Sequence, residues 1–165
     1  MKVSLDKKIS KSFKILVSKV VLFFLCRGII TLFKNDSKIK QEIESWEDNF
    51  IIQITTEDTA INWQIQKRQG KLYRVKESKP NLSISFKSVD ILFKLVTGRL
   101  GVSKAYAEHR FLLKGEIKDA MSFVRVIDRT EGYLFPSIMT KRILKEVPKR
   151  EKPMLEIYGR LLLNM

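Results

Sequence analysis

Side chains that could carry out chemistry are few in this sequence. His109 is the single histidine and Cys26 the single cysteine. A metal site built from nitrogen and sulfur ligands therefore has almost no donors. His109 falls in a polar turn, so neither a cysteine–histidine pair nor a serine–histidine–acid triad has support. We expect no catalytic residue, no metal site and no cofactor, and we interpret the protein as a non-enzyme.

Three carboxylates, Glu108, Glu116 and Asp119, lie close together in the sequence. Two such groups could exchange protons as a general acid and a general base. They also fall where a strand meets a helix, and solvated acids at that border explain them better. Like the single histidine, they therefore point away from catalysis.

The basic charge of the chain is high and evenly spread. Over 165 residues the net charge is +14, which indicates an anionic partner or a role in solubility. Phosphate binding needs clustered Lys and Arg, and Trp63, Tyr73 and Tyr106 lie in apolar alternation rather than among such clusters. We therefore expect no nucleic-acid partner. A solvated surface and an anionic membrane surface both stay open.

Alternating apolar and polar residues predict strands with one buried face. Four such segments follow one another, joined by short polar turns, and we expect them to pair as an antiparallel meander. A fifth strand is expected later in the chain. The five segments are 50–56, 60–66, 70–76, 81–87 and 110–116.

Helical spacing of apolar residues predicts a helix after Ser88. Its main stripe can pack on the sheet, whereas Ile91 and Leu95 lie off that stripe and need another cover. Further apolar-faced helices are expected at 117–132, 137–147 and 154–165. The main stripe after Ser88 consists of Val89, Leu92, Phe93, Val96 and Leu100.

Residues 9–33 form a long apolar stretch interrupted by basic residues. The longest unbroken apolar run is Val20–Cys26, well short of the roughly 20 residues that a membrane span needs, and no signal-peptide cleavage site follows it. We favour an amphipathic helix that docks on the protein or lies at a membrane interface; a signal anchor stays open. The single cysteine cannot form an intrachain disulfide, so we expect a cytoplasmic protein, free or peripheral at a membrane.

The run from Asn81 to Asp128 resembles the lipid-binding domain of the sterol carrier protein family, type two. The resemblance rests on "NLSISFKSVDILFKLVTGRL", "AYAEHRFLLKGEI" and "KDAMSFVRVID". In that family a Thr-Gly-basic-Leu element follows the apolar helix, and here it is Thr97-Gly98-Arg99-Leu100. The family often has Gly where His109 stands, and the C-terminal segment does not match it.

The resemblance implies an α/β (α+β) protein with a mostly antiparallel sheet of about five strands, covered by helices around an apolar cavity. An extra N-terminal amphipathic helix precedes it. We divide the chain into an N-terminal helical region (1–48), a lipid-binding core (49–135) and a C-terminal helical extension (136–165). No feature of the sequence predicts an oligomeric state.

The function implied by the resemblance is non-catalytic binding, with transfer between membranes, of a sterol, fatty acid, acyl-CoA or phospholipid. From the residues alone, a further helix that fills the gap above the sheet is the simpler expectation; the resemblance favours a cavity. The alternative function is a membrane-associated protein-interaction module anchored by the N-terminal helix. The residues predicted to contact lipid are Trp63, Leu92, Phe93, Leu95, Val96, Leu100, Tyr106, Phe111, Leu113, Met121 and Val124.

Overall fold

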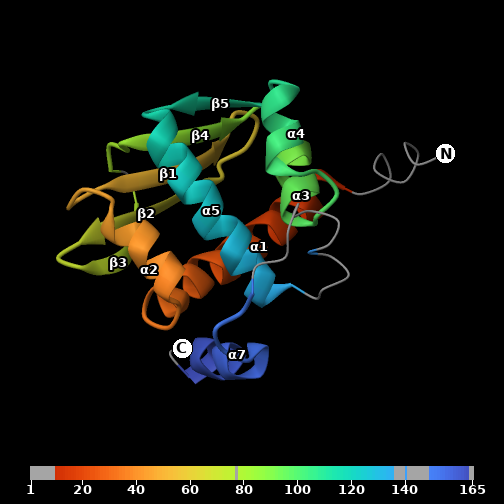
Figure 1. Cartoon of the computed structure of the whole chain (residues 1–165). Helices are drawn as coiled ribbons and strands as arrows, with labels where there is room; N and C mark the ends of the chain where they lie inside the picture. Colours follow the sequence, from red (N-terminus) through yellow and green to blue (C-terminus); the bar gives the residue numbers. More distant parts are fainter. Residues whose placement is uncertain (1–9, 77, 136–139, 141–148, 164–165) are drawn as a thin grey trace.

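A five-stranded sheet forms one layer of the protein, and helices cover one of its faces (Figure 1). The computed structural model describes residues 10–76, 78–135, 140 and 149–163. The sheet has the order β3-β2-β1-β4-β5, and the predicted α+β class is confirmed. The strands are β1 (Ile51–Thr56), β2 (Asn62–Arg68), β3 (Lys71–Val75), β4 (Leu82–Phe86) and β5 (Phe111–Lys114).

The expected meander of four strands is wrong at its last step. β4 pairs with β1 in parallel, whereas the other neighbours are antiparallel. After β3 the chain passes back over β2, where the Gln64 side chain donates to the Ser78 carbonyl (3.0 Å) and accepts from the Ser78 N–H (3.1 Å). Asn81 then meets the start of β1, because its N–H donates to the Ile51 carbonyl and its side chain accepts from the Ile51 N–H, both at 2.9 Å. These contacts bring β4 beside β1.

The register gives the sheet an apolar face and a polar face. Ile54 pairs with Ile84, and Ile84 pairs with Leu113, so these side chains share the face that the helices cover. Gln53 and Gln64 pair on the opposite face. The alternation read from the sequence therefore identifies the buried face correctly.

Two long helices cross above the apolar face, and shorter ones flank them (Figure 1). The α1 helix begins after Ser10, whose side chain accepts a hydrogen bond from the Phe13 N–H (3.2 Å). The expected helix at 137–147 lies outside the described residues, apart from Thr140. The helices are α1 (Lys11–Phe33), α2 (Ser37–Glu44), α3 (Val89–Val96), α4 (Val102–Ala107), α5 (Ile117–Leu134) and α7 (Met154–Leu163).

The predicted N-terminal helix is present as α1, but it is less amphipathic than expected. Its inner side packs into the same core as the sheet, so residues 11–33 are part of the folded unit. By length and composition α1 could cross a membrane, and 44% of its apolar window is buried inside the protein. Its outer side is also apolar, and the exposed side chains there are Phe13, Leu16, Val20, Phe23 and Phe24.

A buried polar cluster fixes the second half of α5. Arg129 Nε donates to Asp36 Oδ1 (2.6 Å), the Tyr133 hydroxyl donates to Asp36 Oδ2 (2.8 Å), and the Glu151 N–H donates to the Tyr133 hydroxyl oxygen (2.7 Å). Burial alone would raise the pKa of Asp36, but the hydrogen bonds, including one from the Ile39 N–H, lower it below its usual value. This Asp36 cluster joins α5 to the start of α2 and to the segment before α7.

The Asp36 cluster also sets the rotation of α5. Arg129 and Tyr133 are four residues apart and therefore share one side of the helix. Glu131 lies midway between them, roughly 200° around the helix from each. Anchoring Arg129 and Tyr133 to Asp36 thus turns Glu131 toward the opposite side, which faces the cavity described next.

Candidate lipid-binding cavity

An apolar cavity of about 260 Å³ lies between the sheet and the helices. The sheet contributes Ile54, Ile84 and Phe86 of β1 and β4, together with Phe111 and Leu113 of β5. These are residues on the apolar face at the β1–β4–β5 side of the sheet. The cavity therefore lies above one half of the sheet, because β2 and β3 contribute no residue to its wall among those described.

The α3 helix forms one side of the cavity. Its N-terminus is capped by Asp58, whose Oδ1 accepts a hydrogen bond from the Val89 N–H (2.7 Å). Leu92, Leu95 and Val96 line the cavity, while the helix packs chiefly against α1 rather than against the sheet. The sequence showed apolar residues on two sides of this helix. Both sides are accounted for, because α3 packs against α1 and also lines the cavity.

The α5 helix forms the longest wall. Its predicted stripe, from Ile117 through Met121 and Val124 to Ile127, faces the cavity. Four residues further along the same stripe comes Glu131, which also lines the cavity. From Met121 to Glu131 the helix rises about 15 Å, so the hollow is long in the direction of this helix.

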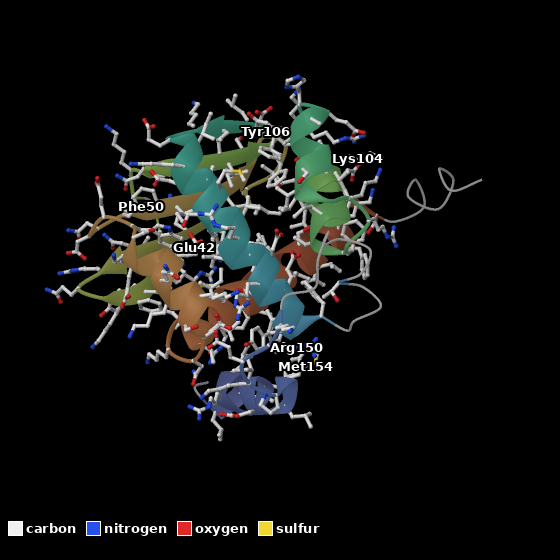
Figure 2. The ribbon with its side chains drawn as sticks, in the orientation of Figure 1. Glu42, Phe50, Lys104, Tyr106, Arg150 and Met154 are labelled. Carbon is white, nitrogen blue, oxygen red and sulfur yellow. The ribbon has the colours of Figure 1, made fainter. Side chains whose placement is uncertain are left out.

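The mouth of the cavity lies between α4 and the first turns of α5. Three wall residues are more than half exposed there: Tyr106 (55%), Ile117 (67%) and Met121 (51%). Tyr106 reaches from α4 toward β5, where its ring centroid lies 5.8 Å from that of Phe111 (Figure 2). An apolar molecule could enter here and meet aromatic and thioether side chains first.

Eight of the eleven residues predicted to contact lipid lie in the cavity wall. Contact with lipid itself stays a prediction. The structure brings together elements that are distant in sequence, with α3, α4, β5 and α5 each contributing. The eight are Leu92, Leu95, Val96, Tyr106, Phe111, Leu113, Met121 and Val124.

Trp63, Phe93 and Leu100 are buried but do not line the cavity. Trp63 is on β2, outside the half of the sheet that floors the cavity. Phe93 is rotated about 100° from Leu92 around α3, and the Arg99 guanidinium carbon lies 5.6 Å from the centre of its ring. Leu100 is buried beyond the end of α3. The periodicity of apolar residues identified all three as buried, but it could not distinguish a residue that packs against other side chains from one that lines a cavity.

Several wall residues were not among the predicted lipid contacts, and two sets of them are informative. Val21, Leu22 and Leu25 of α1 close one side of the cavity. Local periodicity does not reveal which face of this helix turns inward, because apolar residues lie on both its inner and its outer side. Glu131 could have been found, because extending the apolar stripe of α5 by one further turn from Ile127 reaches a carboxylate. A charged residue on the core face of a helix is the signal.

Glu131 is the unusual group of the wall. It is 4% exposed, and its Oε2 has no hydrogen-bond partner among the described residues. Burial, with a smaller contribution from the negative charge of Asp128, raises the pKa of Glu131 to about 8. The side chain is therefore mostly protonated at neutral pH and can both donate and accept a hydrogen bond.

The other candidate groups lie apart from the cavity. His109 is exposed in the turn after α4, with φ of 50°. Cys26 is buried, and burial raises the pKa of its thiol to about 11, which keeps it in the unreactive protonated form. In the parts of the chain that the structure describes, no group of three or more His, Cys, Asp or Glu is placed to hold a metal ion.

Comparison with solved structures finds similar chains. A chain described as "UbiJ-SCP2 Ubiquinone synthesis protein" is 12% identical, with a TM-score of 0.50, covering 72% of this chain and 99% of that one. The sterol carrier protein domain 2 of Helicoverpa armigera is 19% identical, with a TM-score of 0.48, covering 68% of this chain and 89% of that one. A search of curated proteins found no match.

Comparison with models of protein families identifies the family of this chain. The model described as the SCP-2 sterol transfer family matches residues 29–128. This segment runs from the second half of α1 to the middle of α5 and contains most of the cavity wall, whereas Glu131 lies just beyond it. Because the match spans more than half of the chain, the protein is a member of the SCP-2 sterol transfer family.

Proposed function

We propose that the protein binds the hydrocarbon part of one lipid molecule in the cavity, without changing it chemically, and moves that lipid between membranes. The observation that carries this proposal is the hollow of about 260 Å³ walled almost wholly by apolar side chains. Membership of a sterol transfer family supports it. The family and the cavity are observed; we infer the ligand and its transfer between membranes.

The energetics of transfer favour such a carrier. Each methylene group removed from water contributes about 0.8 kcal/mol, so a lipid tail rarely leaves a bilayer unaided. A cavity that replaces most of those contacts lowers the cost of leaving. Ligand sites for drug-sized molecules measure about 300–1,000 Å³, and the cavity is slightly smaller than that range. We therefore favour one chain or one compact ring system over a ligand with two buried chains.

A saturable titration tests the proposal. A polyene fatty acid that fluoresces only in apolar surroundings is added to the purified full chain. We expect one bound molecule per chain, with a dissociation constant in the micromolar range or below, and competition by non-fluorescent single-chain lipids. Binding without saturation, or no fluorescence change at micromolar protein, contradicts the proposal.

The outer side of α1 favours a second role, docking of the protein on a membrane. Leu16 and Val20 are 60% and 44% exposed and lie on one side of the helix, and Lys19 beside them is also exposed. Apolar side chains can enter the region between headgroups and tails, while basic residues attract anionic lipids. We infer that α1 is the surface through which the carrier meets a bilayer; a membrane-anchored interaction module uses the same surface.

Replacing both Leu16 and Val20 by Glu should weaken binding to vesicles that contain anionic lipid by about tenfold or more, since each buried aliphatic side chain contributes about 1.5–3 kcal/mol. Cosedimentation with the vesicles measures this. The matched control replaces Tyr73 and Leu112, two exposed apolar residues on the strands β3 and β5, by Glu and makes the same change in charge. Equal losses in the two double variants contradict a docking role for α1.

A further inference from the structure

Glu131 is a buried polar group that the fold does not explain. Its neighbours on α5, Arg129 and Tyr133, have their partners in Asp36, whereas Glu131 Oε2 has no hydrogen-bond partner among the described residues. Leaving a buried polar group unpaired is unfavourable. Such a group in the wall of an apolar cavity indicates a partner that arrives from outside the chain.

The position of Glu131 in the cavity wall indicates where that partner binds. The mouth residues Ile117 and Met121 are exposed, whereas Glu131, further along the same helix, is 4% exposed. The buried part of the hollow therefore carries a carboxyl group, and the open end at Met121 lies about 15 Å away along α5. A molecule bound to Glu131 has its polar end inside and its apolar remainder directed toward the mouth.

The charges around Glu131 decide which polar group fits. The described residues that line the cavity include no Lys or Arg, so none of them can neutralise an incoming anion. Asp128, one turn before Glu131, adds a second acid whose pKa burial raises. A carboxylate or phosphate would therefore meet a carboxyl group in apolar surroundings, which disfavours it. A cationic amine would have to give up its hydration on entering the same surroundings.

We propose that the Glu131 carboxyl group binds the uncharged hydroxyl end of a lipid that enters the cavity with this end first. The inference rests on the proposed lipid binding and adds to it the identity of the polar contact. A protonated carboxyl group donates to the hydroxyl oxygen and accepts from the hydroxyl hydrogen, so both partners are satisfied. The site at Glu131 therefore prefers a neutral lipid alcohol to the anionic acid of the same length.

A competition experiment at pH 7 tests this proposal. It measures how well 1-decanol and decanoate each displace the fluorescent fatty acid from the protein. We expect the protein to prefer the alcohol by about tenfold, because the alcohol makes one buried hydrogen bond and avoids the burial of an unneutralised charge. Glu131→Leu should weaken decanol binding by about tenfold relative to the unchanged protein and leave decanoate no weaker. Glu131→Gln, whose amide also donates and accepts, should recover most of the alcohol affinity that Glu131→Leu loses.

Asp128→Asn is the matched control, because it removes a neighbouring acid that is not part of the cavity wall. The alcohol preference should survive in this variant. If the unchanged protein binds both ligands equally, or if Glu131→Leu keeps the preference for alcohol, the role of Glu131 is overturned while lipid binding stands. If the probe itself does not bind to the unchanged protein, the proposed function fails.

Discussion

Replacing Val124 by Trp is expected to weaken lipid binding severely and leave the protein folded. Val124 lies in the middle of the α5 wall and is only half-buried, so a larger side chain can extend into the hollow without displacing a packed neighbour. An indole there excludes three or four methylene groups of a ligand, each worth about 0.8 kcal/mol, and this weakens binding about a hundredfold. Titration with the fluorescent fatty acid measures the loss.

Lys118→Trp is the control for this variant. Lys118 lies in the first turn of the same helix, is exposed and does not line the cavity. Both variants gain an indole on α5, and both should keep the circular dichroism spectrum of the unchanged protein. A folded Val124→Trp protein that binds the probe with full affinity shows that the lipid lies somewhere other than this cavity.

Glu131→Gln is expected to make the protein more stable in alkaline solution and to have little effect in acid. Burial raises the pKa of Glu131 to about 8 from its ordinary value of 4.5. Between these two pH values the folded state binds more protons than the unfolded state. Its stability therefore falls as pH rises through this window and levels off above about 8, with a total loss of up to about 5 kcal/mol.

Gln resembles the protonated Glu side chain but cannot ionise, so the variant should lack this loss. Urea unfolding at pH 5 and pH 9 measures the difference in the free energy of unfolding. Asp128→Asn serves as the comparison, since Asp128 is the minor cause of the raised pKa and its removal should lessen the loss without abolishing it. Parallel pH profiles for Glu131→Gln and the unchanged protein contradict a buried, protonated Glu131.

Much of this architecture follows from local patterns in the sequence. Alternation of Ile54 with Gln53 identifies the buried face of β1, and the stripe from Ile117 to Ile127 identifies the inner side of α5. These patterns are reliable because burial of one face forces a period of two in strands and of 3.6 in helices. The family resemblance between Asn81 and Asp128 agrees with the segment that the family model matches.

Contacts between distant segments could not be predicted in this way. The parallel pairing of β4 with β1 depends on hydrogen bonds that Gln64 and Asn81 make across the sheet, and local periodicity contains no information about such partners. The position of Trp63 outside the cavity depends in turn on the strand order. The part that α1 plays in the wall depends on which side of this helix packs inward, and apolar residues lie on both its inner and its outer side.

The central claim is that the hollow between the sheet, α1, α3 and α5 holds one lipid chain. Native mass spectrometry of the full chain, incubated with an equimolar amount of 1-decanol, tests it most directly. Our account requires a complex with one added molecule per chain that is absent for Val124→Trp and present for Lys118→Trp. No complex with the unchanged protein, or equal complexes with both variants, would show that the cavity is not the binding site.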